Sequence, residues 1–270
     1  MNIIEKYNAR ADAVGSLLCV GLDSDITQIP ARFQSDSTPQ FAFNRWIIDQ
    51  TQAFTSAYKL NAAFYEARGE QGWHELRLSI NYLRENYPDV LTICDAKRGD
   101  NSNSNTGYVK AIFDELGFDA ITLHPYMGRE ALQPFLKRVD KGAIILCRTS
   151  NSGAGELQDL QIDGRPLWQV VAEKVIRDWN VNGNCMLVVG ATYPSEMRQI
   201  RAVTGDMTFL VPGIGAQGGD VDAVVEAGLN SAGKGLILTA SRSIIFADHP
   251  GEAAQSARDQ IKNAALRLAR

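Results

Sequence analysis

The stretch VLTICDAKRGD, residues 90–100, joins an apolar run typical of a buried β-strand to a charged end. The side chains of residues i and i+2 of a strand point to the same face, so those of Asp95 and Lys97 are predicted to lie on one face of the strand. Cys94 and Ala96 would then face the opposite side. The sequence therefore predicts a buried strand whose end presents a carboxylate beside an ammonium group.

Seven more short apolar runs resemble this strand. They cover residues 16–23, 57–65, 120–125, 142–149, 185–192, 208–215 and 235–240. Amphipathic helical stretches lie between or beside them, at residues 41–54, 73–87, 106–117, 129–140, 165–179, 195–205, 220–228 and from 251 to the end. Near-continuous apolar runs that alternate with helices are typical of parallel strands covered on their outer face.

Eight such units in 270 residues indicate an α/β protein with a closed (β/α)8 TIM barrel, and residues 1–270 are predicted to form one domain. An open doubly wound sheet is the alternative architecture. The sequence carries no GxGxxG after the first strand and no Walker motif, which disfavours that alternative. The polar tract NSNSN, residues 101–105, is predicted to be an active-site loop.

The composition excludes several classes of function. Apolar residues make up 45% and charged residues 21%, and the net charge is −4 without a long basic run, so neither nucleic acid nor an anionic membrane surface is an expected partner. No apolar stretch approaches the ~18 residues of a membrane span. The four cysteines lie in apolar runs and are predicted to be buried, reduced thiols. With no apolar leader at the N-terminus, these features predict a cytoplasmic protein.

Charged and polar residues gather where the predicted strands end, which is the face of a barrel that carries function. Lys59 interrupts the apolar run AYKLNAAF and therefore needs a charged partner. Together with Asp95, Lys97 and Asp100, it forms an alternating Lys-Asp-Lys-Asp set at one mouth. A salt-bridged rim that only stabilises the barrel is the alternative interpretation.

The last two strands predict a phosphate site of the kind found in phosphate-binding barrels. PGIGAQGGD, residues 212–220, is rich in glycine, so its backbone N–H groups can approach an anion closely. Gln217 adds a side-chain donor, and Arg242 adds a planar cation suited to bidentate phosphate contact. The alternative for the loop alone is an ordinary glycine-rich turn.

These motifs together resemble the orotidine 5′-monophosphate decarboxylase family, in its longer bacterial-type branch. The resemblance rests on DAKRGD, the lysine of YKLNAAFYE, the GLD after the first strand, and PGIGAQGGD followed by the arginine after the last strand. It implies a metal- and cofactor-free enzyme of de novo pyrimidine biosynthesis. Such an enzyme converts orotidine 5′-monophosphate (OMP) to UMP and CO2 as a homodimer with shared active sites.

The resemblance also implies a role for each matching residue. Lys97 would protonate the C6 carbanion, Asp95 would lie beside the departing carboxylate, Lys59 would bind ribose and orient Asp95, and Asp100 would reach the neighbouring subunit's site. Asp23 and Ser104 would bind ribose, Ser150 and Pro212 would contact the pyrimidine, and Gln217 and Arg242 would hold the phosphate.

The chain departs from the family's usual pattern at three places. Ser104 stands where threonine is usual, with Thr106 as a competing choice, Ser241 stands where glycine is frequent, and Asn101 replaces an aliphatic residue. None of these positions belongs to the Lys-Asp-Lys-Asp set.

Three other functions remain open on the sequence. A Mg²⁺-dependent sugar-phosphate decarboxylase or aldolase of the same barrel group would need a spare acidic ligand, for which Glu66 is the nearby candidate. A Schiff-base mechanism on Lys97 or Lys59 is disfavoured, because flanking carboxylates keep these amines protonated. A silent nucleotide-binding barrel is the third possibility.

Overall fold

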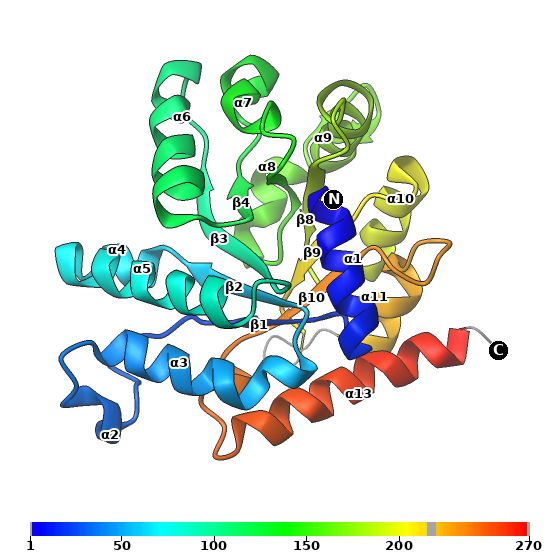
Figure 1. Cartoon of the computed structure of the whole chain (residues 1–270). Coiled ribbons are helices and arrows are strands. Elements are labelled where there is room, and N and C mark those ends of the chain that lie inside the picture. Colours follow the sequence, from blue (N-terminus) through cyan, green and yellow to red (C-terminus); the bar gives the residue numbers. More distant parts are fainter. Residues whose placement is uncertain (1, 215–219, 269–270) are drawn as a thin grey trace.

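The computed structural model describes residues 2–214 and 220–268, and its parallel strands close into a barrel (Figure 1). The strand order around the barrel is β1-β10-β9-β8-β5-β4-β3-β2. The strands are β1 Leu18–Gly21, β2 Ala57–Asn61, β3 Leu91–Arg98, β4 Ala120–Leu123, β5 Gly142–Arg148, β8 Cys185–Val189, β9 Phe209–Pro212 and β10 Leu236–Ala240. Because β1 pairs with both β2 and β10, the sheet has no open edge, and the predicted TIM barrel is confirmed over the open sheet.

Helices surround the barrel and account for the apolar character of its strands (Figure 1). They are α1 Ile3–Val14, α2 Ala31–Gln34, α3 Pro39–Thr51, α4 Ala63–Glu66, α5 Gly69–Asn86, α6 Ser102–Val109, α7 Gly128–Leu136, α8 Gly155–Gln158, α9 Leu167–Lys174, α10 Pro194–Thr204, α11 Val221–Gly228, α12 Arg242–Ile245 and α13 Pro250–Leu268. Two π-helical segments, η2 Lys110–Leu116 and η4 Val175–Trp179, extend α6 and α9, and two short 3₁₀ turns are η1 Gln52–Phe54 and η3 Ser152–Ala154. Strands covered in this way are buried on both faces, as β1, β4, β8 and β10 are along their whole length.

The sequence did not predict α1, although its start carries a capping signal. The side chain of Asn2 accepts a hydrogen bond from the Glu5 backbone N–H, and the Glu5 side chain accepts one from the Asn2 backbone N–H. This reciprocal pair satisfies two backbone donors that a helix start otherwise leaves unpaired. The helix lies across one end of the barrel in Figure 1.

The prediction that residues 101–105 form an active-site loop was wrong. The side chain of Asn101 accepts from the Ser104 backbone N–H and caps α6, so the helix begins at Ser102, four residues before the predicted start. Asparagine competes well for such a cap, which is why a tract that resembles a loop begins a helix. A short hairpin, β6 Gln161–Ile162 with β7 Arg165–Pro166, likewise occupies the predicted start of α9.

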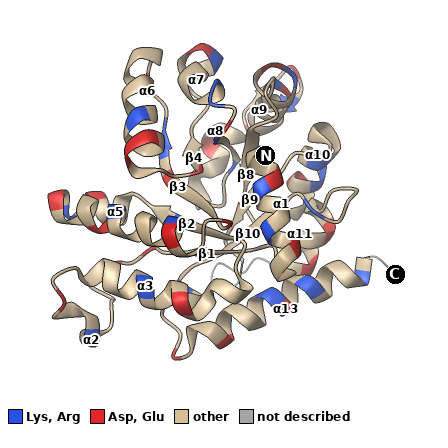
Figure 2. Ribbon diagram, viewed as in Figure 1, with Lys and Arg blue, Asp and Glu red and all other residues tan. Residues whose placement is uncertain are grey.

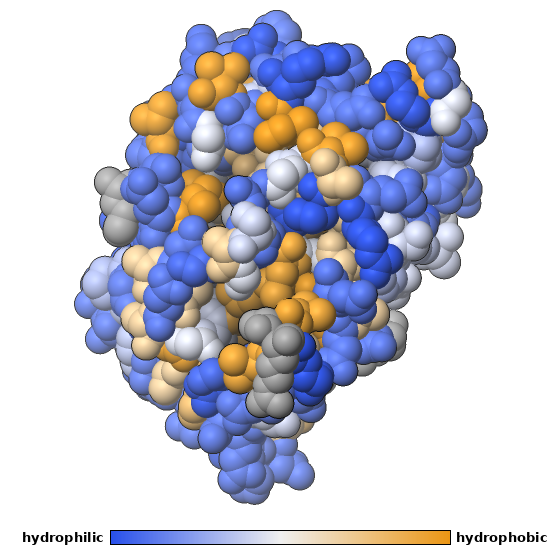
Figure 3. Space-filling model, turned by 90° about the vertical axis from the view of Figure 1, so that its right-hand side faces the viewer, coloured by the Kyte–Doolittle hydropathy of each residue, from blue (hydrophilic) through white to orange (hydrophobic). Residues whose placement is uncertain are grey.

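The surface carries charges of both signs on the outer helices (Figure 2). On the face that Figure 3 shows, hydrophobic residues form patches between hydrophilic ones. None of the helices in the described ranges is both long and apolar enough to cross a membrane. The cysteines Cys19, Cys94, Cys147 and Cys185 are free and buried, as predicted, and burial raises the pKa of each thiol to about 12.

Candidate active site

A cavity of about 170 Å³ opens where the strands β1, β2, β3, β9 and β10 end. It is lined by Asp23, Lys59, Asn61, Asp95, Pro212, Gly213, Ile214, Thr239, Ser241 and Arg242. These residues lie far apart along the chain, and the barrel brings their strand ends to one mouth. Five of the residues predicted from the sequence to form the site line this cavity: Asp23, Lys59, Asp95, Pro212 and Arg242.

Lys59 lies at the centre of the charged group in this cavity. Its ammonium is 3.2 Å from Asp23 Oδ1 and 3.1 Å from Asp95 Oδ2, and the residue is only 4% exposed. Burial alone would lower the pKa of Lys59, but the two carboxylates outweigh it and raise the pKa above its usual value. Lys59 is therefore a fixed, permanently charged ammonium rather than a neutral amine.

Asp95 connects the two lysines. Its Oδ2 accepts from Lys59, while its Oδ1 accepts from Lys97 Nζ at 2.7 Å and from the Thr122 hydroxyl at 2.9 Å. Burial would raise the pKa of Asp95, but the adjacent ammonium groups hold it well below its usual range. The carboxylate is thus ionised and accepts from three donors, two of which are ammonium groups.

Lys97 reaches this group from an irregular part of β3. Cys94 pairs with Ile121 and Arg98 with Leu123, so three residues of β3 face the single residue Thr122 of β4. Lys97 itself has φ 46°, in the left-handed region that non-glycine residues seldom adopt. The strict i, i+2 alternation therefore breaks at this point, yet the Lys97 and Asp95 side chains still meet.

The Lys97 ammonium is the accessible member of the group. Its side chain is 51% exposed, against 6% for Lys59. Lys97 is not among the residues that line the cavity, but Asp95, which does line it, holds the Lys97 ammonium at 2.7 Å, so this ammonium can act on a ligand that binds there. The geometry suits stabilisation of a negative charge and donation of a proton.

Asp100 makes no ion pair or hydrogen bond with the other three charged residues. The buried side chain of Asn105 accepts from the Asp100 backbone N–H and donates to its carbonyl, and Asp100 Oδ1 accepts from the Asn101 backbone N–H. Gly99 has φ 156° and packs against the ring of His124, which leaves no room for a Cβ there. The loop thus holds Asp100 in one place, at the start of α6, without a contact to Lys97.

The remaining predicted residues lie on separate elements. Ser150 follows β5 and packs against Gly190, Ser104 is exposed on α6, and the Thr106 hydroxyl donates to the Ser102 carbonyl within that helix. Arg242 begins α12. Gln217 and most of the glycine-rich loop lie outside the described residues.

Glu66 is unsuited to the role that the Mg²⁺-dependent alternative would give it. Its carboxylate forms an ion pair and hydrogen bond with Arg98, which also donates to the Ala96 carbonyl. A carboxylate held by a guanidinium is a poor ligand for a hard cation, because the metal would have to displace that partner. No set of three or more His, Cys, Asp or Glu side chains that could hold a metal occurs in the described part of the chain.

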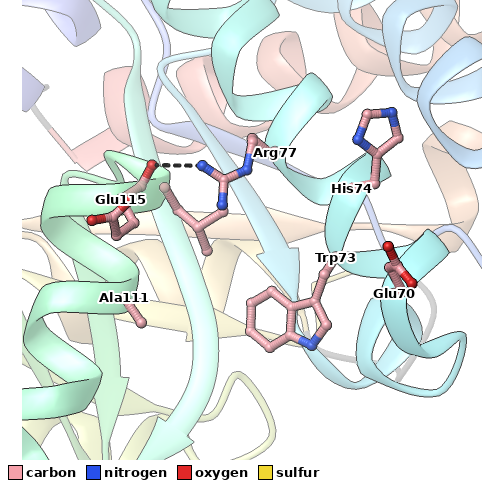
Figure 4. Close-up of a pocket in the computed structure, with 7 residues that line it drawn as sticks. Glu70, Trp73, His74, Arg77, Ala111 and Glu115 are labelled. Atoms are coloured by element: carbon pink, nitrogen blue, oxygen red, sulfur yellow. Dashed lines mark hydrogen bonds between the residues drawn. The ribbon is translucent and has the colours of Figure 1, made fainter.

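A second hollow lies in the helix layer, away from the strand ends (Figure 4). This groove, with a volume of about 470 Å³, lies between α5 and η2 and is lined by Glu70, Trp73, His74, Arg77, Ala111, Glu115 and Leu116. Its one hydrogen bond in Figure 4 joins Arg77 to the Glu115 carbonyl at 3.4 Å. The groove contains none of the predicted site residues, so the strand-end cavity is the better candidate despite its smaller volume.

Sequence reasoning missed Thr122 and Asn105. Thr122 follows an apolar pair in AITLHP and is uncharged, so it was not counted among the charged residues at the strand ends. Asn105 lies in the tract that was interpreted as a loop. The signal for Thr122 was its polarity within an apolar run, since buried polar groups need partners, whereas Asn105 lies in a polar tract that carries no such signal.

Comparison with known proteins points to one family. The model of the "Orotidine 5′-phosphate decarboxylase / HUMPS" family matches residues 16–257. A protein of Janthinobacterium sp. (strain Marseille) named orotidine 5′-phosphate decarboxylase is 45% identical over 259 residues, which cover 96% of this chain and 94% of that protein. A protein of Cellvibrio japonicus with the same name is 45% identical over 260 residues, covering 96% of this chain and 94% of that protein. The solved structure of Leishmania donovani OMP decarboxylase is similar with a TM-score of 0.89 and 37% identity, covering 98% of this chain and 100% of that one.

Proposed function

The chain belongs to the orotidine 5′-phosphate decarboxylase / HUMPS family, and from this premise we propose that it converts OMP to UMP and CO2. The observation that carries the proposal is the charged group at the strand ends. Asp95, which lines the cavity, is ionised between Lys59 and Lys97, and the Lys97 side chain is half-exposed. The names of the curated relatives support this member of the family over the sugar-phosphate alternative.

The energy barrier of the reaction arises at one carbon atom, C6 of the pyrimidine. When the C6–carboxylate bond breaks, CO2 departs and the bonding electrons stay on C6, where no conjugated group accepts them. An ammonium directed at C6 stabilises this charge more than it stabilises the neutral carbon of the bound substrate, and only such a difference lowers the barrier. Lys97 Nζ then gives its proton to C6, which yields UMP, and the lysine is reprotonated from solvent.

Asp95 serves this step in two ways. Its carboxylate holds the Lys97 ammonium at 2.7 Å, so the cation does not have to move as the charge develops. It would also lie beside the substrate carboxylate and disfavour the bound ground state relative to the transition state. Lys59, buried behind both, keeps Asp95 ionised and would contact the ribose together with Asp23.

The other end of the cavity suits the phosphate. Arg242 begins α12 beside Ser241, just after β10, and Pro212, Gly213 and Ile214, at and just after the end of β9, line the same cavity. Binding energy from the phosphate, far from C6, can orient the ring before the reaction begins. Gln217 would add a donor, and Ser150 and Pro212 would contact the pyrimidine.

We further propose that the reaction needs no metal or cofactor. The acidic residues that line the cavity, Asp23 and Asp95, already have Lys59 as a cationic partner, and Glu66 has Arg98. The test is turnover of OMP by the purified chain, followed as loss of its ultraviolet absorbance, before and after treatment with EDTA. We expect conversion to UMP at an unchanged rate after EDTA; no turnover, or turnover restored only by Mg²⁺, would contradict the proposal.

The enzyme is also proposed to be a cytoplasmic homodimer with shared active sites. Asp100 and Ser104 lie at the start of α6, and the Asp100 carboxylate contacts neither Lys59 nor Lys97 of its own chain. Exposed Tyr126 and Met127, between β4 and α7, provide apolar surface at the same end of the barrel. A carboxylate that is fixed in place but separate from its own site is suited to serve the site of a second subunit.

A further inference from the structure

We propose that Thr122 is a positioning residue of the active site, because its hydroxyl fixes both the Lys97 backbone and the Asp95 carboxylate. The inference rests on the proposed function, since it concerns how the reacting ammonium is aimed. Thr122 is not itself among the residues that line the cavity, and its effect on a ligand passes through the lining residue Asp95 and through Lys97.

The hydroxyl makes two hydrogen bonds that close a ring. Thr122 Oγ1 accepts from the Lys97 backbone N–H at 3.0 Å and donates to Asp95 Oδ1 at 2.9 Å. The same Oδ1 accepts from Lys97 Nζ at 2.7 Å. One hydroxyl therefore links the Lys97 backbone to the carboxylate that also holds the Lys97 ammonium.

The backbone at this point needs such a support. Between the Cys94–Ile121 and Arg98–Leu123 pairs, three residues of β3 face Thr122 alone. The backbone hydrogen bonds of a regular parallel ladder therefore cannot be made to all three residues. Lys97 adopts φ 46°, an unfavourable conformation for a residue with a Cβ that persists only where its surroundings impose it. A side chain that both accepts and donates is required here, and threonine provides this with a single oxygen.

The position of Thr122 makes the hydroxyl effective. The residue is 1% exposed, so water does not compete for its hydrogen bonds. Loss of the hydroxyl would remove the acceptor of the Lys97 N–H and one of the donors that hold Asp95. The Lys97 ammonium would then sample a wider range of positions, and a displacement of about 1 Å can cost a large factor in rate.

The chain contains a matched control for this arrangement. Thr92, at the other end of β3, donates to Asp119 Oδ2 at 3.0 Å and accepts from the Asp119 backbone N–H at 3.1 Å. It is also buried, with 2% exposure. Thr92 therefore has the same chemistry on the same strand pair, at the end of the barrel away from the cavity.

The experiment compares Thr122→Val, Thr122→Ser and Thr92→Val with the wild-type enzyme in OMP turnover and in thermal unfolding. Valine keeps the shape of threonine without the hydroxyl, and serine keeps the hydroxyl without the methyl group. We expect Thr122→Val to lower kcat by roughly 10- to 100-fold with KM changed by less than about threefold. Thr122→Ser should restore kcat to within about fivefold of wild type. Thr92→Val should lower Tm and leave kcat unchanged.

The outcomes separate this inference from the proposed function. Wild-type kcat in a folded Thr122→Val, or an equal loss of kcat in Thr122→Ser, would overturn the inference while OMP turnover by the wild type stands. A wild-type enzyme that does not turn over OMP would overturn the proposed function and this inference with it. If Thr122→Val does not fold, Thr122→Cys takes its place, because a thiol is a weak hydrogen-bonding group; kcat equal to that of Thr122→Ser would then contradict the inference.

Discussion

Replacing Lys97 with alanine is expected to lower kcat for OMP by roughly 10⁴-fold or more, while the protein still folds. The change removes both the cation that faces C6 and the proton that C6 receives. Folding should survive because the Lys97 side chain is half-exposed, and Asp95 keeps Lys59 and Thr122 as partners. Steady-state turnover and the thermal unfolding midpoint measure the two effects separately.

Lys110→Ala is the matched control for this prediction. Lys110 is an exposed lysine at the start of η2, and its removal changes the net charge by the same amount without touching the cavity. Turnover of this variant should equal that of the wild type. If Lys97→Ala retained more than about a tenth of wild-type kcat, Lys97 could not be the proton donor.

Asp100→Ala is expected to lower turnover by roughly 100- to 1000-fold, and mixing it with Lys97→Ala should restore part of the activity. Asp100 pairs with no lysine or arginine among the described residues, and hydrogen bonds with Asn105 fix its backbone. A carboxylate placed in this way contributes to catalysis only if a second subunit brings its own site to it.

The mixture gives a defined amount of activity if sites are shared. A mixed dimer of the two variants contains one site with both Lys97 and Asp100 intact and one site that lacks both. Random exchange makes about half of the dimers mixed, so about a quarter of the wild-type activity should return. Activity no greater than the sum of the two separate variants after subunit exchange would contradict shared sites.

The fold was predictable from the sequence because the strand signal is strong where both faces of a strand are buried. All eight apolar runs became strands of the barrel, in the order that β-α units impose. The prediction for residues 101–105 was wrong because Asn101 caps a helix where a polar tract suggests a loop. The capped start of α1 went unnoticed because its apolar face is narrow, with Ile3, Tyr7 and Ala11 buried. The interpretation of residues 1–270 as one domain stays a prediction.

The charged part of the site was predictable for a different reason. A lysine inside an apolar strand must find a carboxylate, and Lys59 has two, Asp23 and Asp95. The position of Asp100 was not predictable, because the chain bends at Gly99 and the side chain of Asn105, five residues further on, then fixes the loop. The role of Thr122 was not predicted, because it follows from the irregular pairing of β3 with β4, which no spacing in the sequence reveals.

The central claim is that Lys97 faces the carbon that loses CO2. A crystal structure of the chain with UMP bound tests it most directly, because C6 of UMP is the atom that receives the proton. We expect Lys97 Nζ within about 3.5 Å of C6, with the phosphate on Arg242 at the opposite end of the cavity. A nucleotide bound in this cavity with C6 turned away from Lys97, or bound in the groove between α5 and η2, would contradict the claim.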